Sequence, residues 1–371
     1  MTAVVPAFEQ GKIERADFPL TLQLIKNQGI DAMIASPVFY EKLLALATPE
    51  VRDVFDQIRM AAVGGASVAD DVFQQMAYTF RNAHVYTIYG STECEPVSLL
   101  TAVESESLQP SKGFGFCVGT IRPELDGKVL LVVDGPMSAD DLNNACPQGE
   151  IGEIVVCGPQ VTTAYWQDEQ AFVDNKIQDE HNHIWHRLGD IGYFDGEQRI
   201  WLVGRNHNIV VKPDRTVYPA AVEPLLETLP DVKCAGLVAY VPPEADTPQA
   251  VAVLECDPDV APEPCIQRAI ALNDTEQLGI DQFLMTYKLP VDPRHNTKID
   301  ATKLRHSVAW HNRTQRSGPV ISTTALTERS PFLKRLWAYL QERYDPIQGG
   351  VTTLALSLAL VQTFRHAFDV A

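Results

Sequence analysis

Two short apolar segments of the chain each run into glycine, and a helical segment separates them. Ile58–Val63 is followed by Gly64, and His84–Ile88 is followed two residues later by Gly90. Between them, Ala69–Asn82 has the apolar spacing of an amphipathic helix. A strand–helix–strand order lets the two strands pair in parallel, because the helix carries the chain back along the sheet. The sequence therefore predicts an α/β fold with a parallel sheet in this part of the chain.

The pattern changes twice further along. From Gly127 onward, short apolar segments are separated by Gly, Asp and Pro, which is typical of a small β-rich unit. After Arg205, strand and helix patterns mix again, over a length common for one small domain. We predict a partial large domain, a small α+β domain, a polar linker, and a tail with an amphipathic helix and an apolar run. Their expected boundaries are 1–205, 206–312, 313–330 and 331–371.

Composition narrows the range of partners. The chain has 371 residues and a formal net charge of −18, which disfavours nucleic acid, because binding to phosphates depends on Lys and Arg. Seven cysteines without a CxxC pair favour a reducing cytoplasm over a disulfide framework, and the N-terminus shows no signal peptide. The apolar run Val351–Val361 is too short to span a membrane alone. We expect a cytoplasmic protein whose C-terminal tail is the segment suited to association with the inner face of a membrane.

The segment Tyr89–Glu93, with the sequence YGSTE, follows the second predicted strand. The carboxyl end of a strand is where α/β sheets place ligands, and glycine permits their close approach. A hydroxyl beside a carboxylate can hold a phosphate oxygen and Mg²⁺ together. Gly64 and Gly65, at the end of the preceding strand, leave room for a flat ring. A polar loop with a buried Glu93, and a plain Gly-Gly turn, are the alternatives.

Two later segments carry further polar side chains. Asp190 follows a glycine, and its carboxylate can accept both hydroxyls of a ribose. Arg205 can donate to ribose or phosphate oxygens through its rigid fork. Lys298, in the polar loop HNTKID, can stabilise charge that develops during a reaction. A β-hairpin, a surface arginine and a surface lysine are the alternatives for these three residues.

Three closely spaced histidines, His181, His183 and His186, could suggest zinc. No cysteine or carboxylate set completes such a site in the sequence. We therefore interpret them as structural or exposed histidines.

Together, these segments occur in the order and at the separations typical of the adenylate-forming superfamily, which includes acyl-CoA synthetases, peptide-synthetase adenylation domains and firefly luciferases. The resemblance extends from about Leu20 to His311. YGSTE resembles the family motif Tyr-Gly-x-Thr-Glu, and RLGDIGYFDGEQRIWLVGR resembles its Gly-Asp to Gly-Arg stretch. GEIGEIVVCGPQVTTAY resembles its Gly-Glu to Gly-Tyr segment, with Ala164 at a usual glycine. HNTKID resembles its closing Gly-Lys-x-Asp motif, with Thr297 at the glycine.

The resemblance implies a role for each matching residue. The nucleotide would be bound by Gly64, Gly65, Ala66, Tyr89, Gly90, Ser91, Asp190 and Arg205. The catalytic residues would be Thr92 at the α-phosphate, Glu93 at Mg²⁺, and Lys298 between the α-phosphate and the substrate carboxylate. His207 would be the hinge about which a mobile small domain turns. The implied cofactors are ATP and Mg²⁺.

Two departures from the family pattern matter. The Ser/Thr/Gly-rich lysine loop that wraps the β- and γ-phosphates is not found in residues 1–40, so we expect an incomplete large domain. Ile58–Val63 and His84–Ile88 would then have an unpaired sheet edge. Asp214 stands where the family has a glycine that shapes the pantetheine passage of CoA ligases, so CoA is doubtful as the acceptor.

Within the superfamily, the segments WHRLGD and PVDPRHNTKI resemble the olefin β-lactone synthetase branch, whose members adenylate a 2-alkyl-3-hydroxy acid and close a lactone without CoA. The implied function is ATP-dependent activation of a carboxylic acid, fatty or hydroxy-fatty, as acyl-AMP, followed by acyl transfer or β-lactone formation. A catalytically silent AMP-binding scaffold is the alternative. The tail resembles the entry into a membrane domain, or is an ordinary amphipathic helix.

Overall fold

The computed structural model describes residues 17–321, apart from 67, 69, 111–112, 134, 292–298 and 314–317. These residues belong to the first of two units into which the chain divides after Thr323. The tail predicted at 331–371 lies outside the described residues, as does Lys298. Within the described part of the chain, no helix is both long enough and apolar enough to cross a bilayer.

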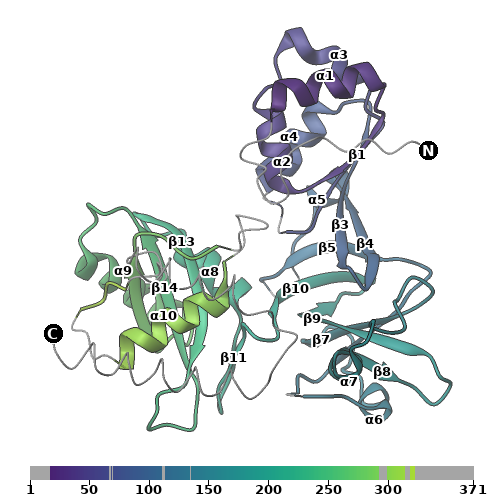
Figure 1. Cartoon of the computed structure of the whole chain (residues 1–371). Coiled ribbons are helices and arrows are strands. Elements are labelled where there is room, and N and C mark those ends of the chain that lie inside the picture. Colours follow the sequence, from purple (N-terminus) through teal and green to yellow (C-terminus); the bar gives the residue numbers. More distant parts are fainter. Residues whose placement is uncertain are drawn as a thin grey trace, which may run out of the picture. The chain divides into compact units, whose positions relative to one another are not determined.

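Ten strands of the described region form one mixed sheet (Figure 1). Its first strands, β1 (Ala32–Ala35), β2 (Met60–Gly64) and β3 (His84–Ser91), pair in parallel, as predicted. β2 lies between β1 and β3, and β3 also pairs with β4 (Cys94–Thr101). The prediction that the second and third strands have an unpaired edge is therefore wrong. The edge falls on β1, whose four residues form too short an apolar run to indicate a strand.

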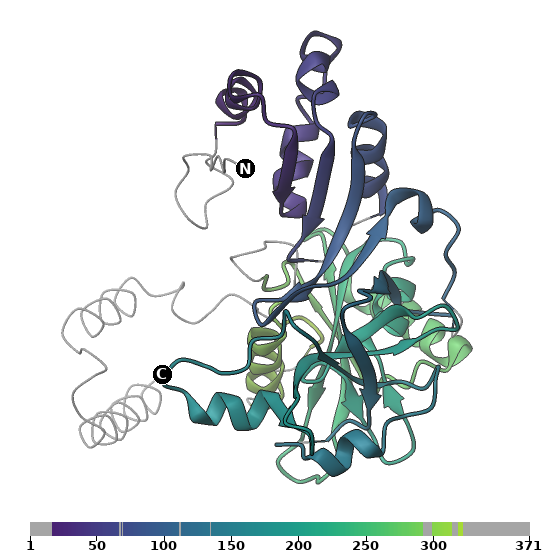
Figure 2. The same ribbon diagram turned by 90° about the vertical axis from the view of Figure 1, so that its right-hand side faces the viewer.

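Helices pack beside these parallel strands around one apolar cluster (Figure 2). They are α1 (Phe18–Gln28), η2 (Pro49–Val51), α2 (Pro37–Leu44), α3 (Arg52–Asp56) and α4 (Asp70–Thr79). α1 begins after Asp17, whose side chain accepts a hydrogen bond from the Leu20 amide at 2.9 Å, and ends at Gly29 with φ 61°. In the core, the rings of Tyr40 and Phe80 meet edge to face, with centroids 5.9 Å apart.

The second half of the sheet is antiparallel. Its further strands are β5 (Phe116–Ile121), β6 (Asp126–Leu130), β7 (Gly152–Cys157), β8 (Lys176–Gln178), β9 (Ile184–Phe194) and β10 (Arg199–Arg205). Short helices join them: α5 (Ala102–Ser105), α6 (Ala139–Asn143) and α7 (Glu169–Asn175). β9 pairs with β7, β8 and β10 and runs through Gly189 and Gly192, so it is longer than the short strands predicted for this unit. Asp190 consequently lies inside a strand.

A separate sheet of three strands follows. It consists of β13 (Val232–Tyr240), β14 (Gln249–Cys256) and β15 (Gln282–Thr286), with helices α8 (Pro219–Leu226), α9 (Pro262–Glu276) and α10 (Ala301–Arg313). A hairpin of β11 (Val210–Val211) and β12 (Thr216–Val217) precedes it. Glu223 of α8 and Glu227, the residue that follows this helix, accept hydrogen bonds from the Leu237 and Ala235 amides of β13 at 2.8 and 3.0 Å. These bonds satisfy amides at the edge of the small sheet.

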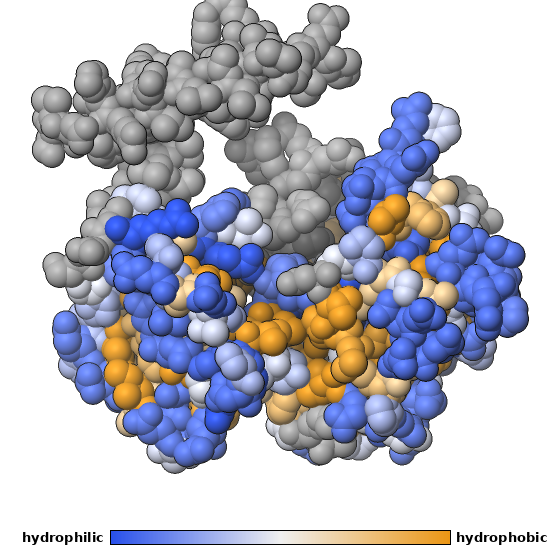
Figure 3. Space-filling view, turned by 90° about the horizontal axis from the view of Figure 1, so that it is seen from below, coloured by the Kyte–Doolittle hydropathy of each residue, from blue (hydrophilic) through white to orange (hydrophobic). Residues whose placement is uncertain are grey.

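Some apolar surface remains exposed. Ile34, Leu131 and Trp166 have exposed fractions of 69%, 66% and 88%. Figure 3 shows a face on which apolar residues gather in a contiguous patch among hydrophilic ones. Surface of this kind is typical of interfaces.

Candidate active site

The YGSTE segment forms the tip of the β3–β4 hairpin and is not a loop beyond the strand. β3 continues through Ser91, β4 begins at Cys94, and Thr92 and Glu93 make the turn. Gly90 is required there, because a Cβ atom would lie 2.6 Å from the Cys94 carbonyl oxygen. Gly64 has the same kind of constraint, since its Cβ would lie 2.6 Å from the Ile88 carbonyl oxygen. Both glycines therefore have a packing reason as well as a predicted binding role.

Glu93 presents a carboxylate that is anionic at neutral pH. Burial raises its pKa, but hydrogen bonds from its backbone amide, Ser91 and Tyr165 lower it, as does the charge of His186 when that ring is protonated, so the net pKa is below the ordinary value. The Tyr165 hydroxyl donates to Oε1 over 3.3 Å. With a side chain 29% exposed and the Ser91 hydroxyl beside it, Glu93 supplies the hard oxygen donors that suit Mg²⁺.

His186 lies behind this hairpin and is 4% exposed. Its Nδ1 is 3.2 Å from the Asn175 carbonyl oxygen, and its Nε2 is 3.2 Å from the Ser91 hydroxyl. Burial, reinforced by the charge of Lys176, lowers the pKa of His186 to about 4, so the ring is neutral at pH 7. The interpretation of this histidine as merely structural or exposed missed its position beside Glu93. By contrast, His183 lies in the preceding turn, 3.2 Å from Asp179.

Lys176 was also not expected near the site. It is 3% exposed, its Nζ lies 3.3 Å from the Thr162 hydroxyl, and the ammonium is 5.4 Å from the centre of the Tyr165 ring. Burial lowers its pKa, while the negative charge of Glu93 acts in the opposite direction. No pattern in the sequence indicates this lysine, because Lys176 lies in β8, outside every family motif.

Asp190 of β9 contacts two other predicted site residues, Tyr89 of β3 and Arg205 of β10. Its Oδ2 accepts a hydrogen bond from the Tyr89 hydroxyl at 2.7 Å, and its Oδ1 lies 2.8 Å from Nε of Arg205. Asp190 is 6% exposed. Burial and the nearby Asp190 raise the pKa of Tyr89, so its hydroxyl stays protonated and can donate. Tyr89 and Asp190 are 101 positions apart in the sequence, and only the pairing of the strands makes them neighbours.

A pocket of about 470 Å³ opens beside these groups. Its lining includes Ser91, Glu93, His186, Arg205 and His207. The predicted hinge residue, His207, therefore lines the same pocket as Glu93, predicted to bind Mg²⁺, and Arg205, predicted to bind the nucleotide. Arg305 of α10 donates to the carbonyl oxygen of His207. Thr92 and the segment Gly64–Ala66 are not among the described residues that line this pocket.

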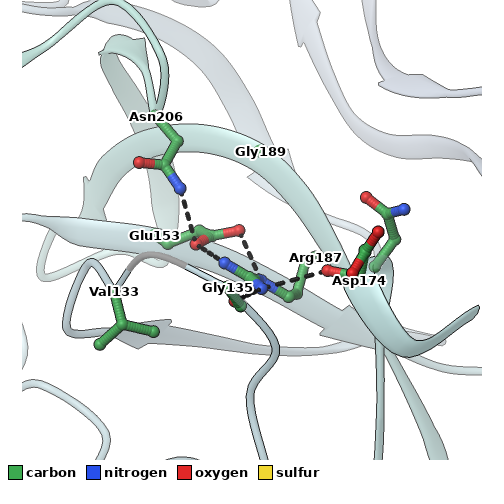
Figure 4. Close-up of a pocket in the computed structure, with 8 residues that line it drawn as sticks. Val133, Gly135, Glu153, Asp174, Arg187, Gly189 and Asn206 are labelled. Atoms are coloured by element: carbon green, nitrogen blue, oxygen red, sulfur yellow. Dashed lines mark hydrogen bonds and ion pairs between the residues drawn. The ribbon is translucent and has the colours of Figure 1, made fainter. Parts of the chain in front are cut away.

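A second pocket, of about 300 Å³, surrounds a buried ion pair (Figure 4). Arg187 binds Glu153 through two hydrogen bonds of 3.0 and 2.7 Å, and also donates to the carbonyl oxygens of Gly135 and Asp174 at 2.6 and 3.1 Å. Asn206 donates to the same Glu153 carboxylate over 3.4 Å. These bonds join β7 and β9 to the residue that precedes His207, which suits a structural role.

Comparison with known proteins gives a family match. Residues 7–166 match the model of the family described as AMP-binding enzyme. The olefin beta-lactone synthetase of Xanthomonas campestris pv. campestris is 30% identical over 319 residues, covering 82% of this chain and 56% of that protein. The protein of the same name from Stenotrophomonas maltophilia is 29% identical, with the same coverage. The chain thus spans about half the length of these relatives.

Solved structures share the fold. An amide bond synthetase from Marinactinospora thermotolerans superposes with a TM-score of 0.57 at 21% identity, covering 78% of this chain and 54% of that one. The o-succinylbenzoate CoA synthetase of Bacillus subtilis, in complex with an acyl-adenylate intermediate, gives 0.57 at 21%, covering 79% and 54%. At this identity the likeness establishes the fold. Because the family match, the curated relatives and the fold agree, we conclude that the chain belongs to the AMP-binding enzyme family.

Proposed function

We propose that this protein takes part in the activation of a carboxylic acid, fatty or hydroxy-fatty, as acyl-AMP. The substrate carboxylate oxygen attacks the α-phosphorus of ATP, the bond to pyrophosphate breaks, and pyrophosphate leaves. The observation that carries the proposal is one pocket lined by Glu93, Arg205 and His207, with Asp190 held by Tyr89 and Arg205 beside it. The names of the curated relatives support it.

Each group has a part in this scheme. The Asp190 carboxylate, positioned from two sides, is suited to accept the ribose hydroxyls. Arg205, whose side chain is 39% exposed, can also donate to phosphate oxygens. Mg²⁺, when bound at Glu93, would neutralise phosphate charge. We assign Lys298 to the developing charge between phosphate and carboxylate, and His207 to the hinge of a small mobile domain.

For the second step we favour internal β-lactone formation over transfer to CoA. In that step the 3-hydroxyl oxygen attacks the acyl carbon, AMP leaves with the bonding electrons, and the hydroxyl proton passes to solvent. Asp214 lies in the turn between β11 and β12 with a side chain 65% exposed, 3.4 Å from Nε of Arg215. A carboxylate in this position would repel the phosphates of CoA.

A silent nucleotide-binding scaffold is the second candidate. Both arginines among the described residues that line the pocket, Arg187 and Arg205, are already paired with carboxylates. A triphosphate would therefore find little uncompensated positive charge in the described part of the pocket.

Pyrophosphate exchange distinguishes the two candidates. In an enzyme that also carries the lysine loop not found in residues 1–40, given ATP, Mg²⁺ and a 2-alkyl-3-hydroxy acid, we expect exchange of labelled pyrophosphate into ATP and accumulation of AMP without CoA. Lys298→Ala should lower the exchange by about 10²–10³. AMP binding without exchange would support the scaffold, and strict dependence on CoA would restore an ordinary acyl-CoA ligase.

A further inference from the structure

Three atoms that can act as acceptors meet at the tip of the β3–β4 hairpin. The Ser91 hydroxyl oxygen lies 3.2 Å from Nε2 of His186. The Glu93 Oε2 lies 3.8 Å from the same nitrogen, too far for a direct hydrogen bond. The Ser91 hydroxyl also hydrogen-bonds to the Glu93 carboxylate and contributes to its lowered pKa. All three residues line the 470 Å³ pocket.

The proton count at this point is unbalanced. The Asn175 carbonyl, 3.2 Å from Nδ1 of His186, can only accept, so the ring proton of the neutral imidazole lies on Nδ1. Nε2 therefore offers a lone pair. The single hydroxyl proton of Ser91 can be donated to Nε2 of His186 or to the Glu93 carboxylate, but not to both. The acceptor that does not receive this proton keeps a lone pair that faces the other two acceptor atoms. A cation between them would remove this conflict.

We infer that Nε2 of His186 is a direct ligand of the divalent cation that Glu93 binds, and that this nitrogen makes the site favour Mn²⁺ over Mg²⁺. The inference rests on the proposed function, because the cation is the one that would accompany ATP. A histidine that donates from Nδ1 to a backbone carbonyl and presents Nε2 is the usual arrangement of a metal ligand. Imidazole suits transition ions, whereas Mg²⁺ prefers oxygen ligands.

The spacing is compatible with one shared ion. Two ligand atoms that each lie about 2.1 Å from a cation are about 3 Å apart when adjacent and about 4 Å apart when opposite. The observed 3.8 Å between Nε2 and Oε2 lies between these two values, so the Glu93 carboxylate would have to move a few tenths of an ångström toward Nε2 to be its adjacent ligand on one ion. Among the described residues, no cluster of three or more His, Cys, Asp or Glu could hold a metal. Water and phosphate oxygens would therefore complete the coordination, as expected for a substrate-linked ion.

Lys176 is the competing positive charge. Among the described contacts, its ammonium forms no direct ion pair with Glu93. Its positive charge nevertheless interacts electrostatically with both Glu93 and His186. Without a metal, Lys176 partly balances Glu93, and it would oppose a cation there. Lys176→Met should therefore bind Mn²⁺ more tightly than the wild type. If no cation binds at Glu93 and His186, the substitution should leave the Mn²⁺ affinity unchanged.

Electron paramagnetic resonance of the 371-residue chain with Mn²⁺ alone tests the inference. We expect Mn²⁺ bound to the protein to show nitrogen modulation from one imidazole. His186→Gln should abolish the modulation and weaken Mn²⁺ binding about tenfold or more, while Mg²⁺ affinity, measured by competition, changes less. His183→Gln, an exposed histidine of the neighbouring turn with a side chain 64% exposed, should behave as wild type.

If the buried position does not tolerate glutamine, the wild-type spectrum alone can still overturn the inference. Bound Mn²⁺ without nitrogen modulation, or no Mn²⁺ binding, would overturn the inference, as would modulation that persists in folded His186→Gln. Because no nucleotide is present, the result is separate from the proposed function. If Mn²⁺ shows a nitrogen ligand but no pyrophosphate exchange is detected, adenylation is refuted. The assignment of His186 as a metal ligand is then still supported.

Discussion

Two neighbouring residues of β9, His186 and Arg187, serve two carboxylates in opposite ways. Arg187 saturates Glu153, which is 1% exposed, with a bidentate ion pair. His186 faces Glu93 with a neutral ring, 3.8 Å away, and leaves that carboxylate open to a pocket. Both residues line the 470 Å³ pocket, and they differ in whether the partner carboxylate is already compensated by a cation. A buried charge that is fully paired indicates a structural role, whereas a charge that is only partly compensated indicates a site that can bind a ligand.

The largest expected effect is on the closed side. Arg187→Met would leave Glu153 buried without its cation and should lower the free energy of unfolding by about 3–5 kcal/mol. Urea unfolding measures this loss. Arg81→Met, which breaks an ion pair whose arginine side chain is 50% exposed, should cost less than about 1 kcal/mol. A similarly small loss for Arg187→Met would show that Glu153 is not held by the pair.

On the open side, Glu93→Gln should change function and not stability. The carboxylate would meet the metal and not the nucleoside, so Mg·ATP use should fall about 100-fold while AMP binding changes little. Pyrophosphate exchange and calorimetry measure the two quantities, with the exposed Glu95→Gln as the matched control. An equal loss of Mg·ATP use and AMP binding would indicate a structural Glu93.

Glu223 offers a third environment, a carboxylate held by a backbone amide. Burial raises its pKa to about 7, above the ordinary value of 4.5. Between these values the native state binds more protons than the unfolded state, so this contribution to stability is present below pH 4.5 and is lost as pH rises through 7. We expect a loss of about 3 kcal/mol over this window, measured by urea unfolding.

The control for this pH effect is Glu227, which directly follows the last residue of α8. Glu223→Gln should flatten the dependence, while Glu227→Gln should retain it. An unchanged pH profile in Glu223→Gln would assign the dependence to other groups.

The smallest effect should come from Tyr89→Phe, which removes one of the two donors that position Asp190. Loss of one hydrogen bond to a charged group should weaken AMP binding about tenfold. Calorimetry checks this, with Tyr86→Phe on the same strand as the control. Tighter AMP binding in Tyr89→Phe would mean instead that the hydroxyl competes with the ribose for Asp190.

Much of the fold could be predicted because it depends on local patterns. The apolar runs at Ile58–Val63 and His84–Ile88, with a helix between them, indicated the parallel strands correctly. β1 was missed because four residues carry almost no periodic signal. The length of β9 was missed because the polar and glycine residues around Asp190 resemble a turn, although its pairing with β7 and β10 keeps that segment extended.

The sequence by itself determined the family and the identity of the candidate residues Tyr89, Glu93, Asp190 and Arg205, because the order and spacing of motifs can be read directly from the sequence. Only the tertiary structure decided which side chains share a pocket and which charges are already compensated. It placed His186 beside Glu93 and Lys176 close by, although neither has a sequence signal of its own. The physical reason is that strand pairing between distant segments fixes distance and burial, and these two quantities decide whether a polar group is satisfied or available to a ligand.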